Sequence, residues 1–409
     1  MRGIRRDNII PARRSLIVMG LLGWLSWAGA TDVYSGATVS MAVRQGQAFS
    51  WGDNRAGQLG NGAWGDTVTS PQPILSALLP VQAMAGGDRH SLALLSNGTV
   101  WTWGDDTDGQ LGIESQGETE PFSLPVAVHG LTDITTIAAG GHFSLALAKD
   151  GTVYAWGRGD LAGEQGTGST SNVTSATAIA LSGPAVAIAA GYGHGLAVLE
   201  DGSVQAWGNN AHGQLGDHTY QTRLNPVTIP GLKEIKAVAA GTAHSLALDL
   251  QGNVWVWGSN ESGQLGTATP GNESLTPVRL SLPEPIIQIV CGGRHSLALG
   301  GTSKMLYGWG SNDSGQVSFG GPPVVRLPQP VTRAFTFEEL QVIQDALARH
   351  QPLPPPPVLG GIVGMAAGDS HSIATDDQGR VWTWGNGSQG QLGRGATAPA
   401  AAAETIPGW

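Results

Sequence analysis

The sequence predicts an all-β protein, a seven-bladed β-propeller that is closed by pairing of its N- and C-terminal strands and carries one short helical insertion in blade six. Three observations support this prediction. The dipeptide Trp-Gly recurs seven times at nearly constant spacing, each copy contains two apolar runs joined by a short turn, and the last copy stops one strand short of a full unit. Repeats of this length are typical of a ring of small antiparallel sheets.

Residues 1–30 differ in composition from the rest of the chain. Five arginines precede the apolar run LIVMGLLGWLSWA, which is followed by the small residues Ala28-Gly29-Ala30. This order is typical of a secretory signal peptide, and an apolar core of 13 residues is short for a membrane span. We therefore expect cleavage after Ala30, a secreted or periplasmic product and no membrane insertion after cleavage. An uncleaved N-terminal anchor is the alternative.

Residues 238–266, VAAGTAHSLALDLQGNVWVWGSNESGQLG, illustrate the repeating unit. The apolar segments HSLAL and VWVWG are joined by the turn QGN, which predicts a β-hairpin. Flanking segments such as NPVTIPG and EIKAVAAG supply further short strands, so that each unit holds four strands. HSLAL and VWVW are apolar on both faces, as expected for sheets that neighbouring blades cover.

The positions of the repeats give the number of blades and the place of the insertion. Trp-Gly pairs begin at residues 51, 103, 156, 207, 257, 309 and 384, so that the spacings are 52, 53, 51, 50, 52 and 75. The long last spacing predicts one insertion at about residues 319–360. We interpret residues 31–409 as a single propeller domain that contains this insertion.

The two ends of the repeat array predict how the ring closes. The chain ends on residues 404–409, ETIPGW, which align with the internal segment TIPGL. Residues 31–43 align with the strand that follows in that internal copy, so the chain after residue 30 begins where the last copy stops. We therefore expect the N-terminal strand to complete the final blade, because this pairing removes an exposed sheet edge.

The insertion contains a predicted helix on a proline-rich stalk. Thr336 and Glu339 form a capping box that predicts a helix over residues 336–350, and Pro352 ends it. The four prolines at residues 354–357 predict an extended polyproline stalk. The apolar positions of the helix, of which the last three have helical spacing, are Phe337, Leu340, Ile343 and Leu347. This stripe either docks on the propeller or forms part of a partner-binding surface.

Five histidines occupy one repeat position, namely His90, His194, His244, His295 and His371. Because this position recurs around a ring, the blades separate the imidazoles, and they cannot converge on one metal ion. Val39 and Phe143 fill the position in the other two copies, so we expect a packing role in which each imidazole is hydrogen-bonded to a neighbouring backbone. We expect no cofactor, no metal and no catalytic residue, and the single cysteine, Cys291, excludes an intrachain disulfide.

The pattern AAG-x-x-H-S-L-A-L followed by G-x-V-W-x-W-G-x-N-x-x-G-Q-L-G resembles the RCC1 repeat, named for the regulator of chromosome condensation. The resemblance covers essentially the whole chain after residue 30 and implies an RCC1-like propeller. The family includes a nuclear guanine-nucleotide exchange factor, ubiquitin-ligase modules, a plant ultraviolet receptor and a secreted β-lactamase inhibitor protein of type II. The ultraviolet receptor would require tryptophans two residues before the motif histidines, where this chain has Asp88, Tyr192, Thr242, Gly293 and Asp369. The secreted inhibitor is similar in architecture and in predicted compartment.

We expect a secreted or periplasmic protein-interaction module that catalyses no reaction, binds another protein and is a monomer. A net charge of −10, or about −14 without residues 1–30, disfavours nucleic acid as a partner. The expected partner-binding residues are Asp88, Arg89, His90, Tyr192, Arg294, Asp369, His371, Phe337, Leu340, Ile343 and Leu347. The resemblance to the exchange factor implies contacts of rim Asp and His residues with a small GTPase, so nucleotide exchange is an alternative function. Inhibition of an enzyme is a second alternative, and a hydrolase or lyase site in the central channel is a third.

Overall fold

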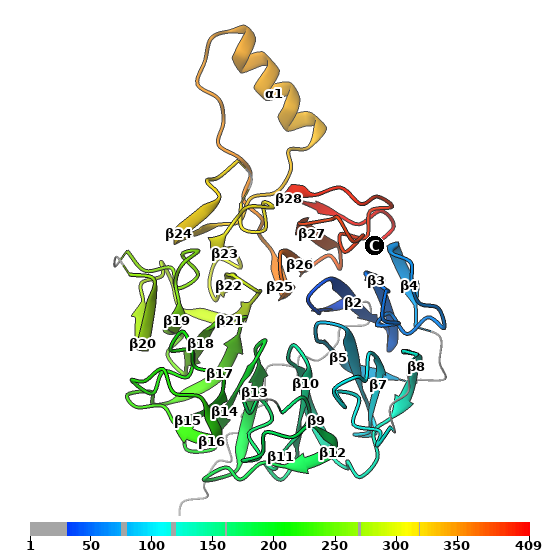
Figure 1. Ribbon diagram of the computed structural model, residues 1–409. Helices are drawn as coiled ribbons and strands as arrows, with labels where there is room; N and C mark the ends of the chain where they lie inside the picture. The colour runs from blue at the N-terminus through cyan, green and yellow to red at the C-terminus, as the bar shows by residue number, and fades with distance from the viewer. Residues whose placement is uncertain (1–30, 75–79, 116–119, 160–161, 269–270, 319) are drawn as a thin grey trace, which may run out of the picture.

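The computed structural model describes residues 31–409, except for residues 75–79, 116–119, 160–161, 269–270 and 319. The predicted signal peptide at residues 1–30 lies outside the described residues. Seven four-stranded antiparallel sheets are arranged as blades around a central axis (Figure 1). The predicted all-β, seven-bladed propeller is confirmed.

Each blade consists of four strands that are consecutive in the chain. Blade one contains β1 (Thr31–Ser35), β2 (Val39–Arg44), β3 (Gln47–Gly52) and β4 (Val68–Pro73). Blade two contains β5 (Val81–Gly86), β6 (His90–Leu95), β7 (Val100–Gly104) and β8 (Phe122–Ala127). Blade three contains β9 (Ile134–Ala139), β10 (Phe143–Ala148), β11 (Val153–Gly157) and β12 (Val173–Ala178). Blade four contains β13 (Ala185–Ala190), β14 (His194–Leu199), β15 (Val204–Gly208) and β16 (Arg223–Thr228).

The remaining blades follow the same order from the channel to the rim (Figure 1). Blade five contains β17 (Ile235–Ala240), β18 (His244–Asp249), β19 (Val254–Ser259) and β20 (Glu273–Leu280). Blade six contains β21 (Ile286–Cys291), β22 (His295–Gly300), β23 (Leu306–Ser311) and β24 (Val324–Pro330). The insertion that follows holds α1 (Phe337–Ala348), and blade seven contains β25 (Ile362–Ala367), β26 (His371–Asp376), β27 (Val381–Gly385) and β28 (Ala400–Thr405).

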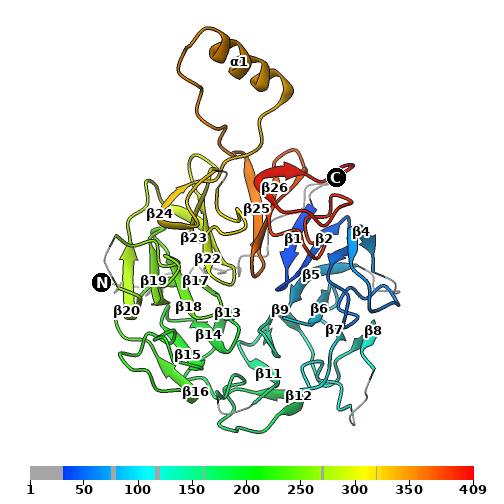
Figure 2. The same ribbon diagram turned by 45° about the horizontal axis from the view of Figure 1, so that its top comes forward.

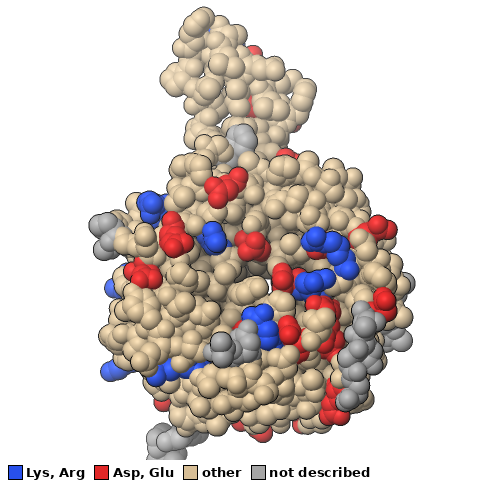
Figure 3. Space-filling view, in the orientation of Figure 1, with Lys and Arg blue, Asp and Glu red and all other residues tan. Residues whose placement is uncertain are grey.

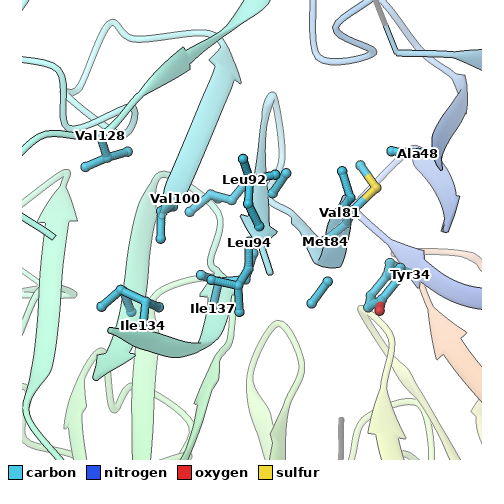
Figure 4. Close-up of a cluster of buried hydrophobic side chains, with 14 of the residues drawn as sticks. Tyr34, Ala48, Val81, Met84, Leu92, Leu94, Val100, Val128, Ile134 and Ile137 are labelled. Atoms are coloured by element: carbon cyan, nitrogen blue, oxygen red, sulfur yellow. The ribbon is translucent and has the colours of Figure 1, made fainter. Parts of the chain in front are cut away.

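The apolar core lies between the blades. The second strand of every blade from two to seven is buried along its whole length, because neighbouring sheets cover both of its faces. Figure 4 shows one such cluster, in which Met84 of β5, Leu92 of β6 and Ile137 of β9 lie in the space between sheets. The Trp-Gly tryptophans are all fully buried at these interfaces, namely Trp51, Trp103, Trp156, Trp207, Trp257, Trp309 and Trp384.

The ring closes in a different way from the one predicted. β1 pairs with β2 in blade one, and β28 pairs with β27 in blade seven, so the N- and C-terminal strands do not share a sheet. Blade one packs against blade seven instead, and the main-chain N–H of Asp369 donates to the carbonyl oxygen of Ala37 over 2.9 Å. The predicted alignment of the two chain ends is compatible with this arrangement. The pairing was wrong because the last strand of one repeat and the first strand of the next belong to different blades.

The insertion forms the predicted helix. Thr336 is the N-cap of α1, its hydroxyl accepts a hydrogen bond from Glu339 N, and the Glu339 carboxylate accepts one from Thr336 N, as in a capping box. Arg349 is the C-cap, so the observed span of Phe337–Ala348 lies within the predicted residues 336–350. Within the described ranges α1 is the single helix, and its 12 residues fall short of the length that spans a bilayer.

Candidate protein-binding face

The turns between the first and second strands of the seven blades surround one opening of the central channel. Residues from all seven turns line this opening, among them Gly36, Gly87, Gly140, Gly191, Gly241, Gly292 and Gly368. Main-chain hydrogen bonds of 2.9–3.2 Å join neighbouring turns around the whole circle. Their donors and acceptors are Ala37 N to Gly87 O, Asp88 N to Gly141 O, Gly141 N to Tyr192 O, Tyr192 N to Gly241 O, Thr242 N to Gly293 O, Gly293 N to Gly368 O and Asp369 N to Ala37 O.

The close packing of these turns requires glycine. A β-carbon on Gly292 would lie 2.5 Å from the carbonyl oxygen of Gly368 in the next blade, and one on Gly191 would lie 2.5 Å from that of Gly241. Such distances are too short for a carbon and an oxygen that are not bonded, so a side chain would push the turns apart. The turns therefore form a closed platform of main chain, on which the following residue of each turn can vary.

Side chains on this platform differ from blade to blade. Asp88, Tyr192 and Asp369 line the channel opening, and Arg89 and Arg294 occupy neighbouring positions on their turns. Tyr192 is 45 % exposed, Arg89, Arg294 and Asp369 are also exposed, and Asp88 is half-buried. The structure thus brings five of the predicted partner-binding residues to one end of the channel. We call Asp88, Arg89, Tyr192, Arg294 and Asp369 the turn face.

His142 extends this surface, although the sequence analysis did not select it. Its Nδ1 atom lies 3.1 Å from a carboxylate oxygen of Asp108, and its Nε2 atom lies 3.8 Å from one of Asp88. The imidazole meets the ring of Tyr192 edge-on, with the ring centroids 6.1 Å apart. His142 stands one residue before the repeat position that Phe143 fills, and this offset is the feature that could have revealed it. An offset of one residue turns a side chain from the core to the surface.

The loops between the third and fourth strands lie at the same end of the ring. Asp53 N donates to Thr38 O over 3.2 Å, and Asp105 N donates to Arg89 O over 2.9 Å, so these loops contact the turns directly. The guanidinium of Arg55 donates three hydrogen bonds of 2.7–3.1 Å to the carboxylate of Asp53, and its main-chain N–H donates a fourth over 3.1 Å. Burial opposes ionisation of Asp53, but the bonds from Arg55 outweigh it and lower the pKa of Asp53. Figure 3 shows acidic side chains gathered beside the central hollow, over blades one and two, with basic side chains next to them.

Comparison with protein-family profiles assigns the repeats. The profile of the RCC1-like domain matches residues 171–408, and that of the regulator of chromosome condensation (RCC1) repeat matches residues 45–94 and 97–147. The chain belongs to the RCC1 repeat family. The predicted RCC1 resemblance is confirmed over both halves of the ring.

Relatives with RCC1 repeats include proteins of several kinds. The ultraviolet-B receptor UVR8 of Arabidopsis thaliana is 32% identical over 377 residues, which cover 89% of this chain and 67% of that protein. The human E3 ubiquitin-protein ligase HERC2 is 32% identical over 233 residues, which cover 55% of this chain and 5% of that protein. The chain thus spans a small part of the length of this ligase.

Two solved structures have the same fold. Prp20p from Saccharomyces cerevisiae superimposes with a TM-score of 0.74 at 24% identity, over 98% of this chain and 90% of that chain. Human WBSCR16 superimposes with a TM-score of 0.73 at 21% identity, over 88% of this chain and 94% of that chain. These two likenesses support the propeller architecture alone, because their sequence identities are low.

The RCC1 histidines serve packing, and two of them correct the predicted binding site. His90 is 1% exposed and His371 is fully buried, so these two side chains cannot contact a partner that docks on the turn face. The Nε2 atom of His90 lies 2.9 Å from the hydroxyl oxygen of Ser144 in the next blade. The predicted packing role is confirmed, but the partner is a serine side chain where a backbone group was expected. The same contact recurs in the pairs His194–Ser245, His244–Ser296, His295–Ser372 and His371–Ser40.

The predicted residues on the insertion lie apart from the turn face of the RCC1 ring. Figure 2 shows that α1 projects beyond the rim next to blades six and seven. Phe337 is 75 % exposed, Leu347 is 57 % exposed, and Ile343 is half-buried. Leu340 is 45 % exposed and lines, with Phe335, an apolar hollow of about 580 Å³ against the alanine-rich start of β28. Most of the stripe is therefore exposed, with Leu340 beside the rim of blade seven, and the structure does not dock the stripe as a whole on the propeller.

The described residues offer no metal centre. Among them, no group of three or more His, Cys, Asp or Glu side chains is arranged to hold an ion. The acidic loop after β7 uses its carboxylates internally, since Asp106 accepts a hydrogen bond of 2.8 Å from Leu111 N and Asp105 accepts one of 3.3 Å from Thr107 N. These contacts give the carboxylates a role in shaping the loop.

Proposed function

We propose that this RCC1 protein is a secreted or periplasmic protein-binding module that performs no chemistry and recognises its partner through the turn face. The observation that carries the proposal is the turn face itself. One main-chain platform, repeated seven times, presents a different pair of residues after the turn glycine on each blade around one opening. A repeated scaffold with variable side chains on its surface is suited to recognition by shape and charge.

The composition of the turn face supports binding of a protein. It combines an exposed tyrosine with two arginines and two aspartates, and Tyr and Arg are the residue types enriched at the energetic centres of protein interfaces. Arg89 stands beside Asp88 on blade two, and Arg294 and Asp369 stand on the neighbouring blades six and seven, so a partner with complementary charges at these positions would be favoured over others. The channel that the turns enclose is lined mostly by glycine and alanine, which supply no acid or base. This lining favours binding over a hydrolase or lyase site in the channel.

The relatives support the same class of function. The structure of Prp20p is described together with its binding properties to Gsp1p and histones, so an RCC1 propeller of this shape can bind proteins. Nucleotide exchange on a small GTPase is the second candidate, since Asp88 and Asp369 hold rim positions that the resemblance to the exchange factor implies. Inhibition of an enzyme outside the cytoplasm is the third, and it rests on architecture and predicted compartment. Ultraviolet sensing is disfavoured because none of the five compared positions before the motif histidines holds a tryptophan.

An affinity-capture experiment with two matched variants tests the proposal. Blade five carries the plain turn Gly241-Thr242-Ala243, which serves as an internal template. The turn-face variant replaces each residue by its counterpart in this template, as Asp88→Thr, Arg89→Ala, Tyr192→Thr, Arg294→Ala and Asp369→Thr. The control variant changes exposed turns at the opposite end of the ring, as Lys149→Ser, Glu200→Ser and Leu250→Ser.

The partner is expected to be captured from the extracytoplasmic fraction by the wild-type and control proteins and lost with the turn-face variant. Loss of binding in the control variant alone would contradict the proposal. Purified small GTPases loaded with a fluorescent nucleotide test the second candidate, which requires faster nucleotide release with the wild-type protein than with the turn-face variant. The proposed location is tested by N-terminal sequencing of the exported protein, which should begin at Thr31.

A further inference from the structure

Five buried imidazoles lie directly below the turn face. Each of them is the first residue of the second strand of its blade and directly follows the turn from the first strand. The five residues are His90, His194, His244, His295 and His371. Each Nε2 atom lies 2.9–3.0 Å from a serine hydroxyl oxygen of the next blade. The histidines thus connect the platform of turns to the interface between blades.

The hydrogen-bond chain decides which ring nitrogen carries the proton. Each partner serine donates its single hydroxyl proton to a main-chain carbonyl oxygen, as Ser144 does to Gln110 over 2.9 Å and Ser296 does to Gln264 over 3.0 Å. The other three serines do the same with Gln214, Gln316 and Gln391. Because the hydroxyl proton is used in this way, the imidazole must donate from Nε2, and Nδ1 carries no proton. All five Nδ1 atoms are buried and have no hydrogen-bond partner.

A second proton on these rings would enter a tightly packed main-chain environment. Each Nδ1 atom lies 2.5–2.6 Å from the place where a β-carbon would stand on the first glycine of the turn, and a carbonyl oxygen of the next blade lies 2.5–2.6 Å from the same place, so the ring is packed against main chain. Burial lowers the pKa of His90, His244 and His295 to about 3, and that of His194 and His371 to about 4. The further charged groups that act on them are other histidines, namely His142 on His90, His194 and His295 on His244, and His371 on His295.

We infer that the five inter-blade histidines make the turn face sensitive to acid, because a proton on Nδ1 would put a buried charge, on an atom that has no hydrogen-bond partner in the folded ring, into the contact between blades below each turn. The junction then opens, and the turns above it lose their packing against the next blade. The acid response of the ring is a property of the scaffold, whereas release of a partner by acid rests on the function proposed above. The two statements can be tested separately.

The junction between blades three and four has no His–Ser pair and shows which residues take its place. Phe143 stands at the histidine position and is fully buried, and Gly195 replaces the serine of the next blade. Trp207 still donates its indole N–H to the carbonyl oxygen of Glu164 over 2.8 Å at this junction. The chain therefore contains a natural, non-titrating counterpart of the His–Ser pair, which can be transplanted to another junction.

The sign of the pH effect follows from linkage. In the unfolded chain a histidine titrates near pH 6.5, whereas the buried ones stay neutral until about pH 4 or below. The unfolded state therefore binds more protons below pH 6.5, and the stability that the neutral imidazoles hold above this pH is lost as the pH falls. Each buried histidine should raise the unfolding constant about tenfold per pH unit between roughly pH 6 and pH 4.

The test compares urea unfolding at pH 7.5, 6.5, 5.5 and 4.5 in three proteins. The double variant His244→Phe with Ser296→Gly copies the Phe143–Gly195 pair. For each pH unit of acidification between about pH 6 and pH 4, its unfolding constant should rise about tenfold less than that of the wild-type protein, because one buried histidine has been removed. The control His129→Gln removes an exposed imidazole and should leave that dependence nearly unchanged. An unchanged pH dependence in the double variant would overturn the inference.

Two measurements on the wild-type protein keep the inference testable if the double variant does not fold. Nitrogen-15 NMR of the imidazoles should show protons on Nε2 alone and no titration of the five rings down to about pH 5; protonated Nδ1 atoms at pH 7 would overturn the inference. Hydrogen exchange in residues 86–90 and 191–194, corrected for its intrinsic rate, should become at least about tenfold faster at pH 4.5 than at pH 7. An unchanged exchange rate also overturns it. If exchange accelerates but a captured partner stays bound, the scaffold inference stands and the role of the turn face in binding fails.

Discussion

The indole nitrogen of Trp51 donates a hydrogen bond to the main-chain carbonyl oxygen of Gln391 over 2.9 Å, and it joins residues 340 positions apart. The same bond, from the Trp-Gly tryptophan of one blade to the GQLG-type loop of the preceding blade, recurs at every junction. At the junction of blades one and seven it connects the two ends of the chain. The ring is therefore closed by an ordinary inter-blade contact.

This equivalence predicts that the closing junction is as sensitive as an internal one. Trp51→Phe and Trp257→Phe should each lower the free energy of unfolding by about 2–4 kcal/mol, because each removes a buried donor and part of a packed side chain. Urea unfolding followed by circular dichroism measures both. A Trp51 variant as stable as wild type, beside a destabilised Trp257 variant, would show that the ends are held together by other contacts.

The last residue should contribute to closure. The indole of Trp409 contacts the ring of Phe49 edge-on at 4.8 Å between centroids, and Arg44 lies 5.7 Å from its centroid. Trp409→Ala should cost about 1–3 kcal/mol in free energy of unfolding through lost aromatic and cation–π contacts. Trp64→Ala is the control, since Trp64 is 54 % exposed, and it should change stability by less than about 0.5 kcal/mol. Equal effects of the two variants would contradict the role given to Trp409.

The turn glycines should tolerate no side chain. Gly292→Ala would bring a β-carbon 2.5 Å from the carbonyl oxygen of Gly368, so we expect a loss of at least about 3 kcal/mol in free energy of unfolding or failure to fold. Gly360→Ala is the matched control, because a β-carbon there would meet no atom within 4 Å. Thermal unfolding of both variants measures the difference, and a stable Gly292 variant would show that the turns can move apart.

Removing the helical insertion should leave the ring intact. Arg333 N donates to Pro357 O over 2.9 Å, so the two ends of the insertion lie side by side and residues 335–356 can be replaced by an Asn-Gly turn. Within α1 only Ala346 is buried, and the loss in free energy of unfolding should stay below about 1 kcal/mol. Circular dichroism measures stability, and affinity capture shows whether the helix contributes to partner binding. A shortened chain that unfolds would mean that the insertion supports blades six and seven.

The turn residues illustrate what could be predicted about the candidate site. The repeat pattern located Asp88, Tyr192 and Asp369 on equivalent turns, and these turns do meet at one opening. The pattern also predicted the packing role of His90 and His371, but their second assignment to the partner-binding surface was wrong, since strand alternation has a period of two and a turn of uncertain length leaves its phase open. His142 escaped selection for the same reason.

The insertion shows the same division between local and distant interactions. Its capping box and apolar spacing were sufficient to predict α1 to within two residues at either end, because helix initiation depends on neighbours three or four residues away. No local feature states what the apolar stripe will face. The structure leaves it projecting from the rim, since the neck of the insertion pairs with itself and with β28 through Arg333 and Ala403.

The number of blades could be inferred from the chain alone, because each Trp-Gly pair marks one sheet and short-range hydrogen bonding within a repeat builds that sheet. How the first and last sheets meet could not be inferred in this way. That contact joins groups more than three hundred residues apart, such as Trp51 and Gln391, and a repeating pattern is the same wherever a blade boundary is drawn. Packing in three dimensions selects the boundary, because only whole four-stranded blades bury both faces of every inner strand.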